Sequence, residues 1–169
     1  MKLLDWLWLD GVEGICPTFV SCSLDQFQLG MKVLKETRKY TSINQCRLLG
    51  AHMEGPFLSK SYCGAHELKS ICKPSILVLN ERINGFENDI SLMTLAPELK
   101  GSFEVISRLK ELNIVVSLWH SSAGFKSSLK AFNNGVSMVT HTFNAMKGFH
   151  HRAIGPIGAA ISRDDIFLA

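Results

Sequence analysis

Three side chains that could bind one metal ion stand at the ends of apolar runs in this sequence. Glu54 ends one such run, and His120 and His141 directly follow residues 114–119 and 136–140. An acidic group at the end of a buried strand is costly unless a cation meets it. Because parallel strands present their carboxyl ends at one edge of a sheet, a carboxylate and two imidazoles can converge there on a divalent metal.

Each histidine taken singly has a simpler explanation. His120 and His141 could both be structural side chains that form hydrogen bonds near the end of a sheet. The presence of Glu54 and of the motifs around all three residues favours metal binding instead. His52 lies two residues before Glu54 on the same strand face, which indicates a supporting or structural role for His52 rather than ligation.

Strand-like and helix-like segments alternate along the chain, a pattern typical of βα units around a parallel sheet. The predicted strands cover residues 14–20, 47–53, 89–95, 114–119, 136–140 and 166–169. The predicted helices cover residues 23–40, 102–112 and 125–132, with shorter helical segments at 66–72 and 158–163. We therefore predict an α/β fold, a partial TIM (β/α) barrel with about six of the eight βα units of a closed barrel.

Local signals set several of these boundaries. Ser23 followed by Gln26 matches a capping box, and Ser102 is the expected cap of a later helix. Gly135 supplies the left-handed residue with which helices commonly end. Pro17 lies inside the first predicted strand and weakens its middle, because proline has no N–H to donate to a neighbouring strand.

The bulk composition limits the classes of function. A chain of 169 residues is long enough for one ordinary domain. The five cysteines form no CxxC pair, which argues against a disulfide framework and predicts a reducing, cytoplasmic setting. A net charge of +3 from dispersed Lys and Arg predicts no nucleic-acid partner. Asp5 and Asp10 interrupt the apolar start, so we expect neither a signal peptide nor a membrane span.

Several short motifs occur together in one order. They are GAHMEGPF at 50–57, GAH at 64–66, LAPE at 95–98, VVSLWHS at 115–121, THTFNAM at 140–146, and HHR at 150–152 followed by GAA at 158–160. Together they resemble the N-acetylglucosamine-6-phosphate deacetylases, metal-dependent amidohydrolases with a TIM barrel and a small accessory β-domain. The resemblance runs from about Gly11 to Ala169.

The resemblance makes Glu54, His120 and His141 the ligands of one divalent metal ion. We expect zinc, and iron, cobalt and manganese are alternatives that Glu and His ligands also accept. Within the matched region the family usually has glycine where this chain has Trp119, directly before a metal ligand. A bulky indole there could clash with the sugar or pack outward.

The resemblance also implies a sugar-phosphate substrate and the residues that contact it. Ala65 and His66 match contacts to the sugar, and Asn144 and Ala145 match contacts to the sugar phosphate. Arg152 matches the arginine that neutralises the phosphate, a role suited to its fixed charge and forked donors. Because the family supplies this arginine across a dimer interface, the resemblance implies a homodimer.

The activity that the resemblance implies is hydrolysis of the acetamide of N-acetylglucosamine 6-phosphate to glucosamine 6-phosphate and acetate, a step of amino-sugar catabolism. The family's proton-transferring aspartate follows the eighth barrel strand, so we expect no catalytic residue in this chain and little activity from it alone. We expect residues 1–169 to be a fragment, an incomplete metal-dependent hydrolase barrel domain without the accessory β-domain.

Two other functions remain open. The chain could be the non-catalytic product of a broken or split gene that retains metal or sugar-phosphate binding, or that pairs with a polypeptide supplying the missing strands. It could instead act on another N-acyl amino sugar. The family's Arg-Glu-Pro-Gly reads Arg-Ala-Ile-Gly at 152–155, which weakens the expectation for the geometry of that loop.

Overall fold

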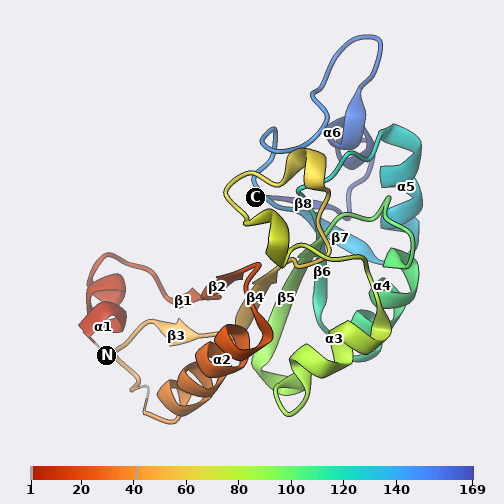
Figure 1. The fold of residues 1–169 in the computed structure, drawn as a ribbon. Coiled ribbons are helices and arrows are strands. Elements are labelled where there is room, and N and C mark those ends of the chain that lie inside the picture. Colours follow the sequence, from red (N-terminus) through yellow and green to blue (C-terminus); the bar gives the residue numbers. More distant parts are fainter. Residues whose placement is uncertain (1, 41) are drawn as a thin grey trace.

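In the computed structural model, which describes residues 2–40 and 42–169, a six-stranded parallel sheet carries the candidate site (Figure 1). Its strands are β2 (Thr18–Val20), β4 (Ala51–Glu54), β5 (Ile90–Leu95), β6 (Val115–Leu118), β7 (Val136–Val139) and β8 (Phe167–Leu168). They lie side by side in chain order, and each is parallel to the next. The predicted parallel α/β fold is confirmed.

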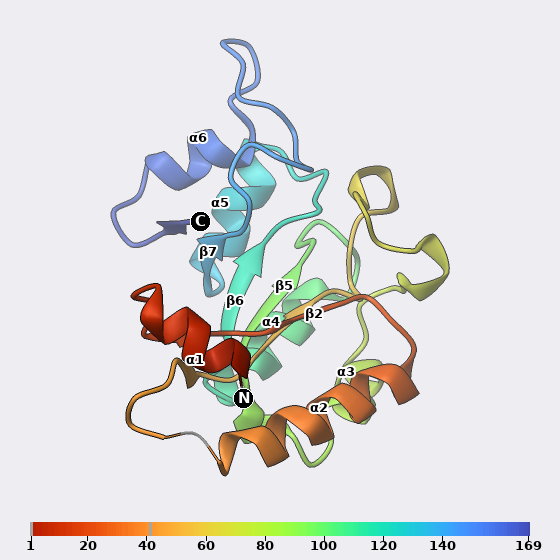
Figure 2. The same ribbon diagram turned by 90° about the vertical axis from the view of Figure 1, so that its left-hand side faces the viewer.

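The connections between the strands are mostly helical. The helices are α1 (Lys2–Leu9), α2 (Leu24–Arg38), α3 (Ile76–Ile83), α4 (Ser102–Glu111), α5 (Phe125–Asn133) and α6 (Gly155–Ile161), with 3-10 turns at Lys60–Tyr62, Leu68–Ser70 and Glu87–Asp89. Helices α2 to α5 cover one face of the sheet (Figures 1 and 2). No helix within residues 2–40 or 42–169 has both the length and the apolar character to cross a bilayer.

The hydrophobic core fills the layer between the sheet and these helices. Met53, Met93 and Leu118 point from successive strands into this layer and are almost completely buried. Helix residues such as Met31 and Ile106 meet them there. Because side chains alternate between the two faces of a strand, the residues between these apolar positions point to the opposite face.

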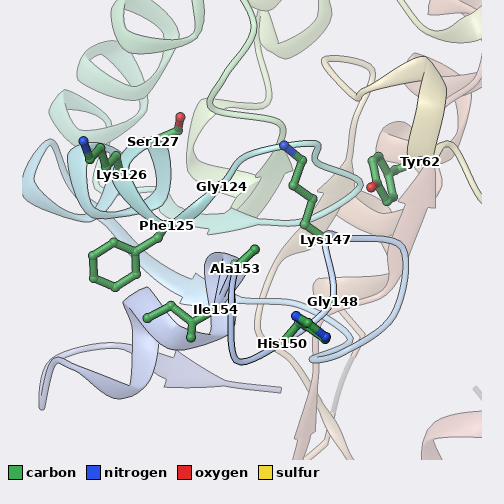
Figure 3. A pocket seen from close by; sticks show the side chains of 11 residues that line it. Tyr62, Gly124, Phe125, Lys126, Ser127, Lys147, Gly148, His150, Ala153 and Ile154 are labelled. Carbon is green, nitrogen blue, oxygen red and sulfur yellow. The ribbon is translucent and has the colours of Figure 1, made fainter.

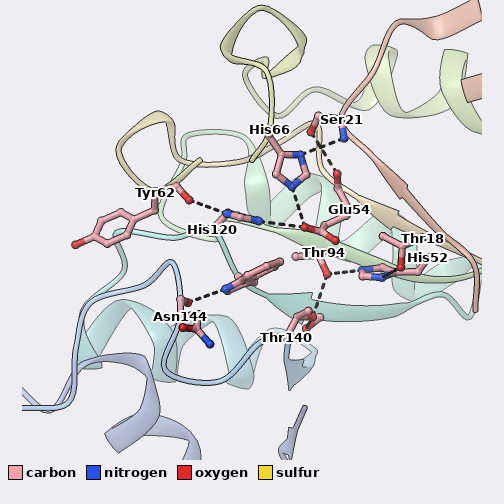
Figure 4. Close-up of polar contacts among 12 residues, drawn as sticks. Thr18, Ser21, His52, Glu54, Tyr62, His66, Thr94, His120, Thr140 and Asn144 are labelled. Carbon is pink, nitrogen blue, oxygen red and sulfur yellow. Dashed lines mark hydrogen bonds and ion pairs between the residues drawn. The ribbon is translucent and has the colours of Figure 1, made fainter. Parts of the chain in front are cut away.

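The opposite face carries a row of hydrogen-bonded polar side chains, which we call the inner polar row (Figure 4). The two ring nitrogens of His52 lie 3.1 Å from Thr18 Oγ1 and 2.7 Å from Thr94 Oγ1. Thr140 Oγ1 lies 3.2 Å from Thr94 Oγ1 and 2.6 Å from Ser117 Oγ. These bonds join five strands or their ends, so the buried polar groups satisfy one another.

The prediction of one continuous strand at residues 14–20 is wrong. The structure divides it into β1 (Gly14–Ile15) and β2, and β1 pairs with β3 (Arg47–Leu48) in a separate two-stranded sheet. The break falls at Pro17, which has no N–H but whose carbonyl accepts a hydrogen bond from His52 N.

The second predicted strand, at residues 47–53, is likewise divided into β3 and β4. The break falls at Gly50, whose φ of +131° is rarely adopted by other residues. A Cβ at Gly50 would lie 2.2 Å from Ser91 Oγ on the neighbouring strand. The close approach of these two segments therefore also requires glycine at position 50.

Two helices were not predicted, and one predicted helix is wrong. No secondary structure was predicted for the residues of α1, and α3 falls in a stretch expected to consist mostly of loops, whereas the helix expected at 66–72 is a single 3-10 turn at Leu68–Ser70. Ser102 is not the cap of α4: Gly101 occupies that position, and Ser102 Oγ donates to the carbonyl of Ala96. The helical turn expected at 158–163 begins earlier, at Gly155.

Two other helix boundaries match the prediction. Ser23 Oγ accepts a hydrogen bond from Gln26 N, and the Gln26 side chain accepts one in return from Ser23 N, so the capping box of α2 is confirmed. Helix α5 ends before Gly135, which has the expected left-handed φ of +112°.

Candidate metal centre

The candidate ligands lie where three strands of the main sheet end. Glu54 is the last residue of β4, His120 lies two residues after β6, and His141 lies two residues after β7. His120 and His141 both have positive φ, +48° and +46°. Residues other than glycine rarely adopt this conformation, and it occurs often where a backbone is held for function.

A carboxylate and two imidazoles come together at this edge of the sheet. The ligand atoms of Glu54, His66 and His120 all lie within 4.8 Å of one another, and all three residues are buried. His66 Nε2 lies 2.8 Å and His120 Nε2 3.1 Å from the same oxygen, Glu54 Oε1 (Figure 4). A carboxylate and an imidazole are donors of the kind that bind zinc and similar ions, so Glu54 and His120 fit a divalent metal.

The two imidazoles also set the charge of Glu54. Burial acts to raise the pKa of the Glu54 carboxyl group, but hydrogen bonds with His120 and His66 outweigh burial and lower the pKa to about 2. The side chain is therefore a carboxylate at neutral pH, the form that binds a cation.

Hydrogen bonds at the other ring nitrogens give the two histidines different roles. His120 Nδ1 lies 2.6 Å from the carbonyl oxygen of Tyr62. A carbonyl can only accept, so Nδ1 carries a proton, and in a neutral ring the Nε2 lone pair faces Glu54. A proton or a cation must then lie between Nε2 and the carboxylate. Metal-binding histidines typically show this arrangement.

His66 has the opposite arrangement. Its Nδ1 accepts a hydrogen bond of 3.1 Å from the backbone N–H of Ser21. In a neutral ring the proton is therefore on Nε2, which donates it to Glu54. The sequence motif assigned His66 to the sugar and offered no sign of this contact, because the backbone group that fixes the ring lies 45 residues away in the chain.

Trp119 packs against two histidines rather than outward. Its ring centroid lies 3.7 Å from that of His120 and 3.8 Å from that of His141, and the residue is 7% exposed. Its Nε1 donates a hydrogen bond of 2.7 Å to the carbonyl of Asn144. His141 is exposed and, among the residues that the structure describes, does not join the Glu54 group.

Comparison with known proteins gives a consistent result. The chain is 38% identical over 156 residues to the N-acetylglucosamine-6-phosphate deacetylase of Bos taurus, covering 90% of this chain and 37% of that protein. The solved structure of the Thermotoga maritima deacetylase matches 99% of this chain with a TM-score of 0.83 and 37% identity. Over most of its length, the chain is similar to the N-acetylglucosamine-6-phosphate deacetylases. The resemblance is confirmed, and the sheet corresponds to part of their barrel.

The extent of the match is partial. The chain spans 44% of the Thermotoga maritima deacetylase chain. It is also 30% identical over 153 residues to an N-acetylgalactosamine-6-phosphate deacetylase of Escherichia coli O157:H7, of which it covers 40%. A search against family models finds no match.

The residues matched to sugar contacts in these deacetylases lie on two loops beside the metal group. Ala65 is exposed next to the buried His66. Asn144 is exposed and its N–H donates to the carbonyl of His141, whereas the carbonyl of Ala145 accepts from Ser121 N. These loops therefore border the site.

Arg152 lies on the long loop between β7 and α6, which projects from the sheet edge (Figure 1). Its side chain is exposed, and its N–H donates to His150 Nδ1. A pocket of about 700 Å³ lies beside this loop (Figure 3). Tyr62, Lys126 and Lys147 line it with His150, so the pocket has a positive rim and reaches the segment that binds His120.

Glu98 organises the segment that follows His120. Its two carboxylate oxygens accept hydrogen bonds from Ser121 Oγ and from both the N–H and the Oγ of Ser122, at 2.6–2.9 Å. The carboxylate therefore holds the chain beyond β6 in place.

Proposed function

We propose that this chain forms the metal-binding and substrate-binding part of a deacetylase that hydrolyses N-acetylglucosamine 6-phosphate to glucosamine 6-phosphate and acetate. The observation that carries the proposal is the pair of Glu54 and His120, in which a buried carboxylate faces an imidazole nitrogen whose partner at Nδ1 is a carbonyl. The similarity to deacetylases over 90% of the chain supports the same conclusion.

Glu54 and His120 would hold one divalent ion, zinc in the first instance, with iron, cobalt or manganese as alternatives. The resemblance assigns the third ligand to His141, but in this structure the His141 ring contacts Trp119 and the metal group is formed by Glu54, His66 and His120. A bound ion of this kind polarises an amide carbonyl and lowers the pKa of a coordinated water. The backbone of Tyr62 keeps the His120 ring in the orientation that ligation needs.

We place the sugar phosphate against the two loops beside this centre, with Ala65, His66, Asn144 and Ala145 as contacts. Arg152 would neutralise the phosphate, and its exposure on a projecting loop is suited to reaching the site of a second subunit in a homodimer. The five unpaired thiols are consistent with a cytoplasmic enzyme.

Residues 1–169 would act as one segment of the barrel domain. The family's aspartate that moves the proton is not matched within them, so the assigned side chains bind and orient, and we expect little acetate release from this chain alone.

The test is a titration of the chain with Zn²⁺ and Co²⁺ against a chromophoric chelator, followed by calorimetry with N-acetylglucosamine 6-phosphate. We expect metal binding that Glu54→Gln abolishes and sugar binding that requires the phosphate. Glu104→Gln is the matched control, because that carboxylate is exposed on α4 and outside the metal group. Metal binding unchanged in Glu54→Gln, or robust acetate release by the 169 residues, would contradict the proposal.

Two specific observations favour alternatives. Trp119 contacts both candidate histidines where the family usually has glycine, which favours a chain that binds metal or sugar phosphate without catalysis. The similarity to an N-acetylgalactosamine-6-phosphate deacetylase favours a second sugar. Calorimetry with both sugar phosphates decides between the two substrates. Acetate release by the chain, once it is supplied with the remaining barrel strands, would contradict the non-catalytic alternative.

A further inference from the structure

We propose that the Trp119 indole keeps His141 out of the metal centre, so that this one side chain sets the metal affinity of the protein. The inference deepens the proposed function, since it concerns the third ligand of the same ion. The inference rests on the contacts that the rings of His66, His120 and His141 make near Glu54. It also rests on the position of the Trp119 indole.

His66 is close to Glu54 but cannot complete the ligand set as a neutral imidazole. A backbone N–H can only donate, so the bond from Ser21 occupies the Nδ1 lone pair of His66 and leaves the proton on Nε2. The Nε2 atom that faces Glu54 is then a donor and has no lone pair for a metal. His66 orients the carboxylate instead.

His141 is the remaining imidazole at this edge of the sheet, and the indole holds it away. The indole contacts the His141 ring edge to face, with centroids 3.8 Å apart and an interplanar angle of 71°. The other side of the contact is the His120 ring, at 3.7 Å. Because the indole contacts both histidine rings, we infer that it separates the His141 ring from the Glu54–His120 pair.

The indole is itself held firmly. Trp119 is only 7% exposed, and its indole N–H donates a hydrogen bond to the carbonyl of Asn144. That bond ties Trp119 to the loop that carries His141, and Asn144 N donates in turn to the His141 carbonyl. Displacing the indole would break this hydrogen bond and expose a buried aromatic ring, so the indole is held between the two histidines.

The experiment measures Zn²⁺ and Co²⁺ affinity of the chain by chelator competition in four proteins: the unmodified chain, H141A, W119G and W119G/H141A. We expect H141A to bind as tightly as the unmodified chain. Removing the indole should tighten binding about tenfold or more, the scale of effects from residues that orient metal ligands. The double variant should lose that gain, and the visible spectrum of bound Co²⁺ should change only in W119G.

W119F is the matched control for the ring, since phenylalanine keeps an aromatic group and lacks the N–H that bonds to Asn144. We expect its affinity to stay near that of the unmodified chain. Circular dichroism checks that each variant is folded. If W119G does not fold, H141A still tests the inference, because it leaves the indole in place.

A tenfold loss of affinity in H141A would overturn the inference, since His141 would then already be a ligand. Equal tightening in W119F and W119G would overturn it as well, because the ring would not be the barrier. Glu54→Gln reports separately on the proposed function: if it leaves metal binding unchanged, the centre itself is wrong, whatever His141 does.

Discussion

The two faces of the parallel sheet are made by the same strands but are held by different interactions. Met93 and Leu118 point toward the helices and are held by apolar packing. Thr94 and Ser117, each one residue away from these, point to the other face and are held by hydrogen bonds. The difference teaches that the helix-covered face supplies stability. The inner polar row and the Glu54–His120 pair at the strand ends position the groups that would bind a metal.

The largest expected effect is on the helix-covered face. Met93→Ala should lower the free energy of unfolding by about 2–5 kcal/mol, because it removes a fully buried side chain and leaves a cavity. Urea denaturation measures the change. Val115→Ala on the neighbouring strand is the control: that side chain is 45% exposed, so a similar loss there would refute the division between the faces.

A metal should stabilise the protein through the other face. At a free Zn²⁺ concentration of 100 times Kd, the free energy of unfolding should rise by about 2.7 kcal/mol, because only the folded state gathers the ligands. Thermal unfolding with and without the ion measures the gain, and chelation should reverse it. The gain should vanish in Glu54→Gln and persist in Met93→Ala; the reverse pattern would contradict the comparison.

Thr94→Val tests the inner polar row. It removes the hydroxyl that bonds to His52 Nε2 and to Thr140 Oγ1. The free energy of unfolding should fall by about 1–3 kcal/mol, because these buried polar groups lose their partner. Denaturant unfolding measures the cost. Thr18→Val is the matched control, since Thr18 is exposed and water can replace it beside His52. Equal costs would show that burial does not decide the effect.

The smallest effect separates backbone strain from contact with the centre. Gly64→Ala and Gly85→Ala both place a side chain at positive φ, so each should lower the free energy of unfolding by about 1–2 kcal/mol. Only at Gly64 would the new Cβ meet His120, 2.8 Å from its Cε1; at Gly85 it meets nothing within 4 Å. Gly64→Ala alone should weaken metal binding in a chelator titration. Equal weakening in both variants would refute a role for this contact.

The sequence predicted best where local signals and apolar spacing agreed. The capping box at Ser23 and the stop at Gly135 are local, so they hold whatever surrounds them. Helix α3 was not predicted because its apolar start is only four residues long and the preceding Ser75 forms no capping bond, and so short an apolar run does not distinguish helix from strand. The first strand was predicted as continuous because its division depends on pairing with β3, which lies far along the chain.

The sequence by itself determined that Glu54 and His120 follow strands of one parallel sheet, since apolar runs and their stops are local properties and parallel strands share an edge. Only the tertiary structure decided which nitrogen of each ring carries the proton, because the backbone groups of Ser21 and Tyr62 that bind those rings lie 45 and 58 residues away from them. It likewise placed Trp119 against both histidines, since ring contacts depend on how neighbouring loops pack and not on their order in the chain.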